Sequence, residues 1–298
     1  HRMIFNKYNP DLILTFGVMI IAWSPLLTAW SDAAGVITSF YRILIAAIVL
    51  FVPFYRIRKK STSISAQNIL LAVFAGVAFG LDNALWSTGV TMAGAANPTF
   101  LVNTAPIWVG LGAMVVFKEH LSNQFWLGLV LAILGAALIL EVDWRQSLES
   151  GAGSLYGLIG GLFYALFFLV GQKVRYNMDT ISFFWIVVAS ASCTLGLIAL
   201  MLGNSFTGYS VSTYIIFVVL GLVMQVGGWL AITYALGRLP AAIVAPILLG
   251  QPVIAAVLAH YMLQERLDRM QIVGAAAVLV GVLFTQRARI ISPDATNN

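Results

Sequence analysis

Charged side chains are scarce in this chain. Only 9% of its 298 residues are Asp, Glu, Lys or Arg, and 60% are hydrophobic, whereas soluble domains average about 25% charged and about 45–50% apolar residues. A water-soluble fold needs a polar surface that this composition does not supply, so the folded chain lies in lipid. The net charge of +5 does not indicate a nucleic-acid partner, because the basic residues lie in short loops between apolar runs.

Cysteine and the common catalytic signatures are also missing. The single cysteine, Cys193, lies inside an apolar run and forms no intrachain disulfide. The sequence has no GxxxxGK[ST] phosphate loop, no HExxH pair and no cluster of Cys and His, the patterns that hold nucleotides and metals. We therefore expect no cofactor, no metal site and no catalytic residue. The sequence argues against ATP-driven pumping and against an enzyme.

Long apolar runs dominate what is present. A bilayer-spanning helix takes roughly 20 residues, so ten spans with short loops use up the chain. The fifth and tenth runs are only just long enough to cross. The fold class that follows is an all-α membrane protein with ten transmembrane helices. The runs fall at 12–30, 37–55, 67–88, 96–117, 124–140, 154–172, 182–202, 213–235, 241–262 and 270–286.

Lys and Arg are divided unevenly between the two ends of these spans. Cytoplasmic loops carry the excess of basic residues. With the N-terminus inside, twelve basic residues lie inside and three outside, and Arg42 lies within a span. Both termini are therefore expected in the cytoplasm, with the loop 141–149 outside. The inner residues are Arg2, Lys7, Arg56, Arg58, Lys59, Lys60, Lys118, Lys173, Arg175, Arg238, Arg287 and Arg289, and the outer ones are Arg145, Arg266 and Arg269.

The chain contains an internal repeat. Pro106 and Pro252 are 146 residues apart, and several other residues match at the same offset. Each repeat holds five spans, an odd number, so the two halves enter the membrane in opposite directions, as in many secondary transporters. We expect the halves at residues 3–145 and 150–290. The further matches are Ala95 and Ala96 with Ala241 and Ala242, Glu119 with Glu265, Leu121 with Leu267, Gly128 with Gly274 and Gly135 with Gly281.

The chain resembles the EamA-type members of the drug/metabolite transporter superfamily. The resemblance rests on Trp23-Ser24-Pro25 in the first span, Tyr41-Arg42 in the second, and the repeated stretches 95–121 and 241–267. It implies a secondary transporter of the bacterial inner membrane, monomeric or homodimeric, that exports small metabolites such as amino acids by alternating access. It also implies a central cavity lined by the third, fourth, eighth and ninth spans, with the first and sixth.

Two other functions stay open on the sequence. One is transport of cationic or drug-like compounds, for which Trp23, Trp86 and Trp229 supply aromatic faces. The other belongs to a different class, a non-transporting membrane subunit or a membrane enzyme. An enzyme needs nucleophile and base residues clustered at one depth, and the sequence shows no such cluster.

Two charged residues lie well inside the spans. Arg42 and Asp82 both lie roughly 8–9 Å below the outer boundary, at about 1.5 Å per helical residue. A charge at a span centre costs about 2.5–3.5 kcal/mol on insertion scales, so neither is expected to face lipid, and equal depth favours an ion pair. The pair is either a structural salt bridge or a site where Asp82 carries a coupling proton or binds an amine.

Polar and aromatic residues recur on equivalent spans. Asp82 and Trp86 lie one helical turn apart on the third span, as do Gln225 and Trp229 on the eighth. A polar group one turn from an indole suits a pocket for an amphiphilic metabolite. The alternative is that amides bond between helices and tryptophans pack on lipid. The candidate substrate-binding residues are Trp23, Asn83, Trp86, Asn103, Tyr164, Gln225, Trp229 and Gln251.

Overall fold

A computed structural model describes residues 9–60, 64–142, 151–264, 267–288 and 290–291. The predicted outer loop beyond residue 142, the matched residue Glu265, the outer residues Arg145 and Arg266 and both chain ends lie outside the described residues. The described helices are α1 (Pro10–Ile21), α2 (Ser24–Ala29), α3 (Gly35–Lys60), α4 (Ala66–Ala93), α5 (Ala96–Val102), α6 (Ala105–Val116), α7 (Asn123–Ile139), α9 (Gly151–Arg175), α10 (Thr180–Met201), α11 (Val211–Val219), the π-helix η1 (Leu220–Trp229), α12 (Leu230–Leu236), α13 (Ala241–Ile247), α14 (Gly250–Leu263) and α15 (Arg269–Arg287).

These helices form the expected membrane spans. Within the described residues, nine segments are long and apolar enough to cross a bilayer, and α7 is a shorter apolar helix of 17 residues. Four spans consist of more than one helix: α1 with α2, α5 with α6, α11 with η1 and α12, and α13 with α14. The all-α membrane fold is confirmed, and the fifth span is as short as the sequence indicates. A two-residue strand pair, β1 (His120–Leu121) with β2 (Ile290–Ile291), is the one addition among the described elements.

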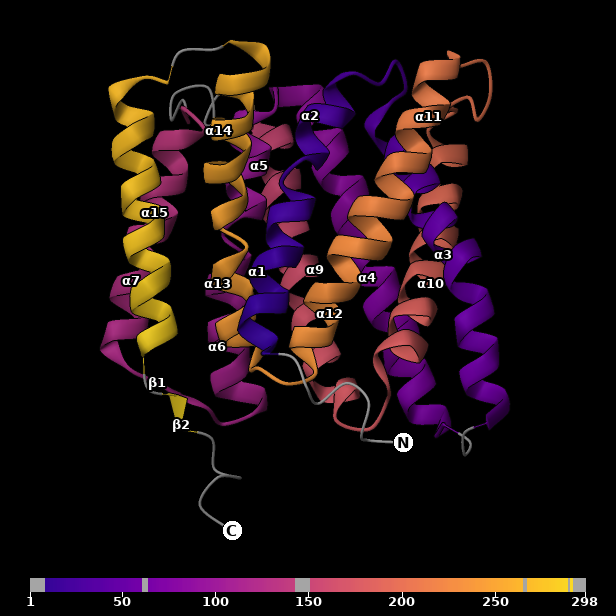
Figure 1. The fold of residues 1–298 in the computed structure, drawn as a ribbon, viewed down its shortest axis with the longest axis horizontal. Helices are drawn as coiled ribbons and strands as arrows, with labels where there is room; N and C mark the ends of the chain where they lie inside the picture. Colours follow the sequence, from indigo (N-terminus) through magenta and orange to yellow (C-terminus); the bar gives the residue numbers. More distant parts are fainter. Residues whose placement is uncertain (1–8, 61–63, 143–150, 265–266, 289, 292–298) are drawn as a thin grey trace.

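The two halves are inverted, as predicted. Figure 1 shows that α1 begins and α15 ends at the lower end of the bundle, where α3 also ends. The second half opens with α9, which begins at the upper end. Five spans carry the chain from one end to the other, so each helix of the second half runs opposite to its counterpart.

Glycines matched by the repeat lie where α7 packs against α15. A Cβ on Gly128 would lie 2.7 Å from the carbonyl oxygen of Gly281, and one on Gly274 would lie 2.6 Å from that of Gly135. The pair Gly128–Gly281 becomes Gly274–Gly135 when the halves are exchanged. A two-fold interface has this reciprocal pattern. The sequence repeat is therefore also the symmetry of the helix contact.

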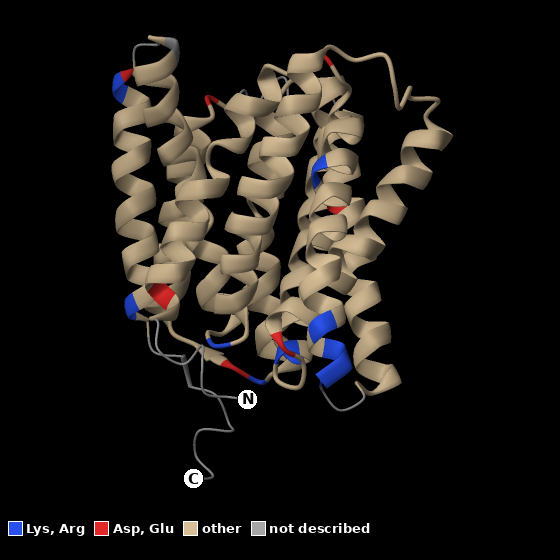
Figure 2. Cartoon of the chain, turned by 45° about the vertical axis from the view of Figure 1, so that its right-hand side comes forward, with Lys and Arg blue, Asp and Glu red and all other residues tan. Residues whose placement is uncertain are grey.

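Basic residues gather at one end of the bundle (Figure 2). Nine of the described Lys and Arg residues lie at the end where α3, α9 and α15 finish, and Arg269 begins α15 at the opposite end. The orientation predicted from the sequence rests on this asymmetry, and the assignment of the basic end to the cytoplasm stays a prediction. The nine residues are Arg56, Arg58, Lys59, Lys60, Lys118, Lys173, Arg175, Arg238 and Arg287.

The α7–α15 contact provides a first test. A Cβ at Gly135 or Gly274 has no room beside the opposing backbone, and overpacking of a tight contact costs about 1–3 kcal/mol. We expect Gly135→Ala and Gly274→Ala each to lower the melting temperature of the purified protein in detergent. Gly151→Ala is the matched control, because a Cβ there meets nothing within 4 Å. Equal melting temperatures for all three variants would contradict the packing described here.

Candidate functional site

Arg42, Asn83, Asp82 and Tyr164 come together inside the bundle from α3, α4 and α9. The Arg42 guanidinium donates a hydrogen bond from Nη2 to Asn83 Oδ1. Asn83 Nδ2 donates to the Phe79 carbonyl at 2.8 Å and lies 3.5 Å from Asp82 Oδ2. Electrostatic interactions connect the Arg42 and Asp82 charges and the Tyr164 phenol. The two intramembrane charges therefore both contact the Asn83 side chain.

The predicted direct ion pair needs revision, because the Asn83 amide lies between the charges. Arg42 bonds to the amide oxygen, and Asp82 lies beside the amide nitrogen of the same side chain. Two buried atoms, Arg42 Nε and Asp82 Oδ1, have no hydrogen-bond partner in the described part of the chain. A direct salt bridge between Arg42 and Asp82 would give both of these atoms a partner. The polar residue between the charges was a candidate site residue in its own right, but nothing in the sequence indicated that it would separate them.

Glycines on α9 bring this cluster close to the neighbouring backbone. A Cβ on Gly160 would lie 3.5 Å from Asp82 Oδ1, so the carboxylate faces α9 directly. A Cβ on the next residue, Gly161, would lie 3.0 Å from the Leu101 carbonyl oxygen and 3.2 Å from that of Val102. These carbonyls belong to the last turn of α5. The glycines thus place the end of a broken helix beside the charged residues.

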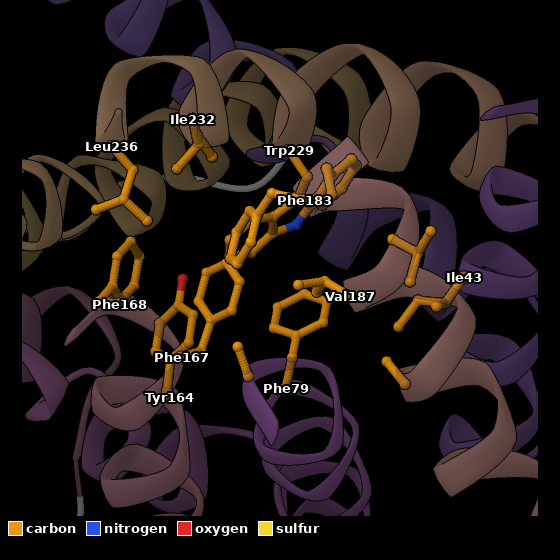
Figure 3. Close-up of a cluster of buried hydrophobic side chains, with 14 of the residues drawn as sticks. Ile43, Phe79, Tyr164, Phe167, Phe168, Phe183, Val187, Trp229, Ile232 and Leu236 are labelled. Carbon is orange, nitrogen blue, oxygen red and sulfur yellow. The ribbon is translucent and has the colours of Figure 1, made fainter. Parts of the chain in front are cut away.

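An aromatic cluster joins the two halves (Figure 3), and the carbonyl of one of its members, Phe79, accepts a hydrogen bond from Asn83. It consists of Phe79, Tyr164, Phe167 and Trp229. The Trp229 ring centroid lies 4.8 Å from that of Phe79 and 5.9 Å from those of Tyr164 and Phe167, all edge-to-face. Trp229 is 7% exposed, so its indole packs against rings and not against lipid. Sequence reasoning missed Phe79 and Phe167, although Phe79 lies one turn before Asn83 and Phe167 three residues after Tyr164.

The eighth span is distorted where it carries its candidate residues. Its middle is a ten-residue π-helix, η1, which contains Gln225 and ends at Trp229. Gln225 is fully buried, and neither its amide oxygen nor its amide nitrogen has a partner among the described residues. π-Helical turns occur frequently at functional sites. The sequence identified both residues but gave no sign of the altered helix.

The remaining candidate residues make no hydrogen bond to Arg42, Asp82 or Asn83 within the described part of the chain. Trp86 donates from Nε1 to Thr99 Oγ1 at 2.9 Å, which joins α4 to α5. Trp23, Asn103 and Gln251 lie at or beside the breaks in the first, fourth and ninth spans. The fourth and ninth spans are broken at equivalent places, before Pro106 and Pro252. Broken helices with equivalent positions in two inverted halves mark the binding region in many transporters.

A second polar network lies at the basic end of the bundle. Gln172 on α9 donates from Nε2 to Glu119 Oε1 at 2.9 Å, and its Oε1 accepts from the Ala241 amide at 2.6 Å. Glu119 precedes β1 in the first half, and Ala241 begins α13 in the second half. Glu119 is 4% exposed and its second oxygen has no partner among the described residues. Burial raises the pKa of the Glu119 carboxyl, and the bond from Gln172 opposes that rise.

Across the described residues, no group of three or more His, Cys, Asp and Glu side chains is placed to hold a metal ion.

Glu119 gives a pH-dependent prediction. Its folded pKa lies above the ordinary value of 4.5, so between these two values the folded state holds the proton more tightly than the unfolded state. Stability contributed by Glu119 is therefore lost as the pH rises through this window. We expect Glu119→Gln to flatten the fall in melting temperature from about pH 4 to pH 7 while keeping the bond to Gln172. Parallel pH profiles for the two proteins would show that Glu119 is not held in this way.

The central charges give a further prediction. Removing one of two coupled buried charges leaves the other uncompensated, which typically costs about 3–5 kcal/mol. Arg42→Met and Asp82→Leu should each lower the melting temperature more than the double variant does. Thermal unfolding of the three purified variants measures this. Additive losses in the double variant would mean that the two charges act independently.

Comparison with known proteins shows which proteins this chain is similar to. The sequence model of the EamA-like transporter family matches residues 11–141 and again 151–287. An uncharacterized transporter of Archaeoglobus fulgidus is 24% identical over 254 residues, which cover 83% of this chain and 86% of that protein. The uncharacterized transporter YdfC of Bacillus subtilis is 24% identical over 249 residues, covering 82% and 79%. A crystal structure superposes with a TM-score of 0.78 at 12% identity, over 93% of this chain and 96% of that one. This chain belongs to the EamA-like transporter family.

Proposed function

We propose that the protein is a secondary transporter that exports small amphiphilic metabolites, such as amino acids, by alternating access. One observation carries the proposal: candidate residues from both halves, on α3, α4, α9 and η1, meet at one place inside the bundle. A charged group, an amide and an aromatic surface lie next to one another there. Such a combination suits a molecule with polar and apolar parts. Inverted-repeat transporters bind substrate between their halves.

The broken spans support alternating access. A helix interrupted inside the membrane leaves carbonyl groups that need other partners. At the α5–α6 break the Leu101 carbonyl accepts from the Thr104 amide at 3.1 Å and from the Thr104 hydroxyl at 2.6 Å. These short local bonds hold the break without a continuous helical ladder. In the proposed cycle, the segments on either side of the breaks move relative to each other as the site opens to one side and then the other.

Proton coupling through Asp82 is part of the proposal. Its Oδ1 is buried without a hydrogen-bond partner within the described chain. In the proposed cycle this carboxyl group takes up a proton on one side and releases it on the other. We further propose that the basic end faces the cytoplasm of the bacterial inner membrane, that the halves comprise residues 3–145 and 150–290, and that the protein works as a monomer or homodimer. Labelling of a cysteine at position 59 from the outside would overturn this orientation.

A second candidate substrate is a cationic or drug-like compound. The aromatic cluster and the Asp82 carboxyl are groups that bind organic cations, and the same residues would serve that purpose. Flux of an amino acid against flux of a lipophilic cation in proteoliposomes separates the two. Flux itself separates transport from a membrane enzyme or a non-transporting subunit.

Trp229 provides the test of the site. Trp229→Ala would open a cavity in packed rings, at a cost of about 3–5 kcal/mol, so Trp229→Phe is the better variant because it keeps an edge-to-face ring. We expect it to weaken apparent substrate affinity in counterflow assays by about tenfold, or 1.4 kcal/mol, with little change in melting temperature. Trp30→Phe is the matched control, since Trp30 is 51% exposed at the end of α2. A lowered melting temperature with unchanged affinity would place the substrate elsewhere.

A further inference from the structure

The Arg42 guanidinium carries a charge that no carboxylate of the described residues contacts directly. Its hydrogen bond goes to a neutral acceptor, Asn83 Oδ1, and its Nε has no partner in the described chain. Arginine pairs most strongly with carboxylate and phosphate groups, through charge-assisted hydrogen bonds. Asn83 therefore holds the guanidinium in position, and Nε is left available for a further hydrogen bond.

The position of Arg42 makes this capacity available inside the bundle. Three of the four neighbours one turn away on α3, Thr38, Ser39 and Ala46, are buried, and the fourth, Ile45, faces η1 at Gly221, whereas Arg42 is partly exposed. The guanidinium points to α4, where it meets Asn83. Its exposed part therefore lies on the inner side of α3. A guanidinium that faced lipid inside a span would be strongly disfavoured.

Packing of the fold does not require a cation at this place. At the repeat offset Arg42 corresponds to Val188 on α10, which is fully buried in the hydrophobic core. The second half thus fills the equivalent position with an aliphatic side chain. α3 and α10 occupy related places in the two halves, yet only α3 brings a charge to the centre.

We propose that Arg42 binds a carboxylate group of the substrate, with Asn83 as the positioning residue that holds the guanidinium in place. This inference rests on the proposed transport function and narrows its substrate class to carboxylate-bearing amphiphiles. The apolar part of the substrate lies toward the aromatic cluster, since Asn83 also bonds to the carbonyl of Phe79. Asp82 is left free to carry the coupling proton. A purely cationic substrate has no partner for Arg42.

The experiment compares leucine with leucinamide, in which a carboxamide replaces the carboxylate. Purified protein in proteoliposomes is assayed for leucine counterflow and for competition by leucinamide, with ligand-induced thermal shifts as a second readout. We expect wild type to prefer leucine by about tenfold to a hundredfold, the range of one charge-assisted hydrogen bond. In Arg42→Gln this ratio should fall to near one. Arg269→Gln, which removes an exposed charge at the start of α15, should keep the wild-type ratio.

Each outcome decides the proposal. An Arg42→Gln variant that binds leucine more weakly but keeps the wild-type ratio shows a structural role and overturns it. Should that variant not fold, Arg42→Gln with Asp82→Asn removes both charges and is expected to show the same ratio near one. Wild-type transport of tetraphenylphosphonium without leucine overturns the carboxylate site and leaves secondary transport standing. Absence of flux for either probe counts against the transport proposal itself.

Discussion

A bilayer offers no hydrogen bonds, so every polar group within the spans has to be satisfied by the chain. Most are satisfied locally: Thr88, Thr91, Ser190 and Thr194 each donate to the carbonyl four residues earlier in their own helix. The exceptions are therefore informative. Arg42 Nε, Asp82 Oδ1 and both amide atoms of Gln225 are among the buried atoms without partners in the described chain, together with Trp108 Nε1, Ser182 Oγ and Thr233 Oγ1 on other helices. Arg42, Asp82 and Gln225 lie on α3, α4 and η1, and the aromatic cluster connects α4 and η1 with α9.

The helix packing around these groups is symmetric between the two halves, but the side chains at the centre differ between them. Reciprocal glycine contacts make the interface between α7 and α15 two-fold symmetric. The fourth and ninth spans repeat the same break. Against this background the central residues differ between the halves: Arg42 has an aliphatic counterpart, and the eighth span is π-helical where α4 is regular. Packing constrains the residues at which two backbones touch, whereas the central side chains of the two halves can differ and so form a site.

The sequence alone predicts the arrangement of the spans and most of the residues of the candidate site. Span number, inversion and the short fifth span follow from apolar runs and the repeat, because lipid imposes a fixed length and an odd number of spans imposes inversion. Arg42, Asp82, Asn83, Tyr164 and Trp229 follow from polarity within those runs. The contacts among these residues do not follow from the sequence. Asn83 rather than Asp82 receives the guanidinium because side-chain direction depends on helix rotation, which spacing along one helix does not fix. Trp86 shares a face with Asp82 yet bonds to Thr99 on α5.

One helix connects the central cluster with the network at the basic end. α9 carries Gly160 and Tyr164 beside the charges, and two turns further on Gln172 bonds to Glu119 and to the first residue of α13. It is continuous over 25 residues, in contrast to the broken spans around it. Because a regular helix moves as a unit, a shift of α9 that accommodates a ligand near Tyr164 also displaces Gln172. The bond from Gln172 to Glu119 in the first half and the bond to α13 in the second then cannot both keep their geometry unless those segments follow. The continuity of α9 thus makes the centre and the basic end of the bundle mechanically dependent on each other.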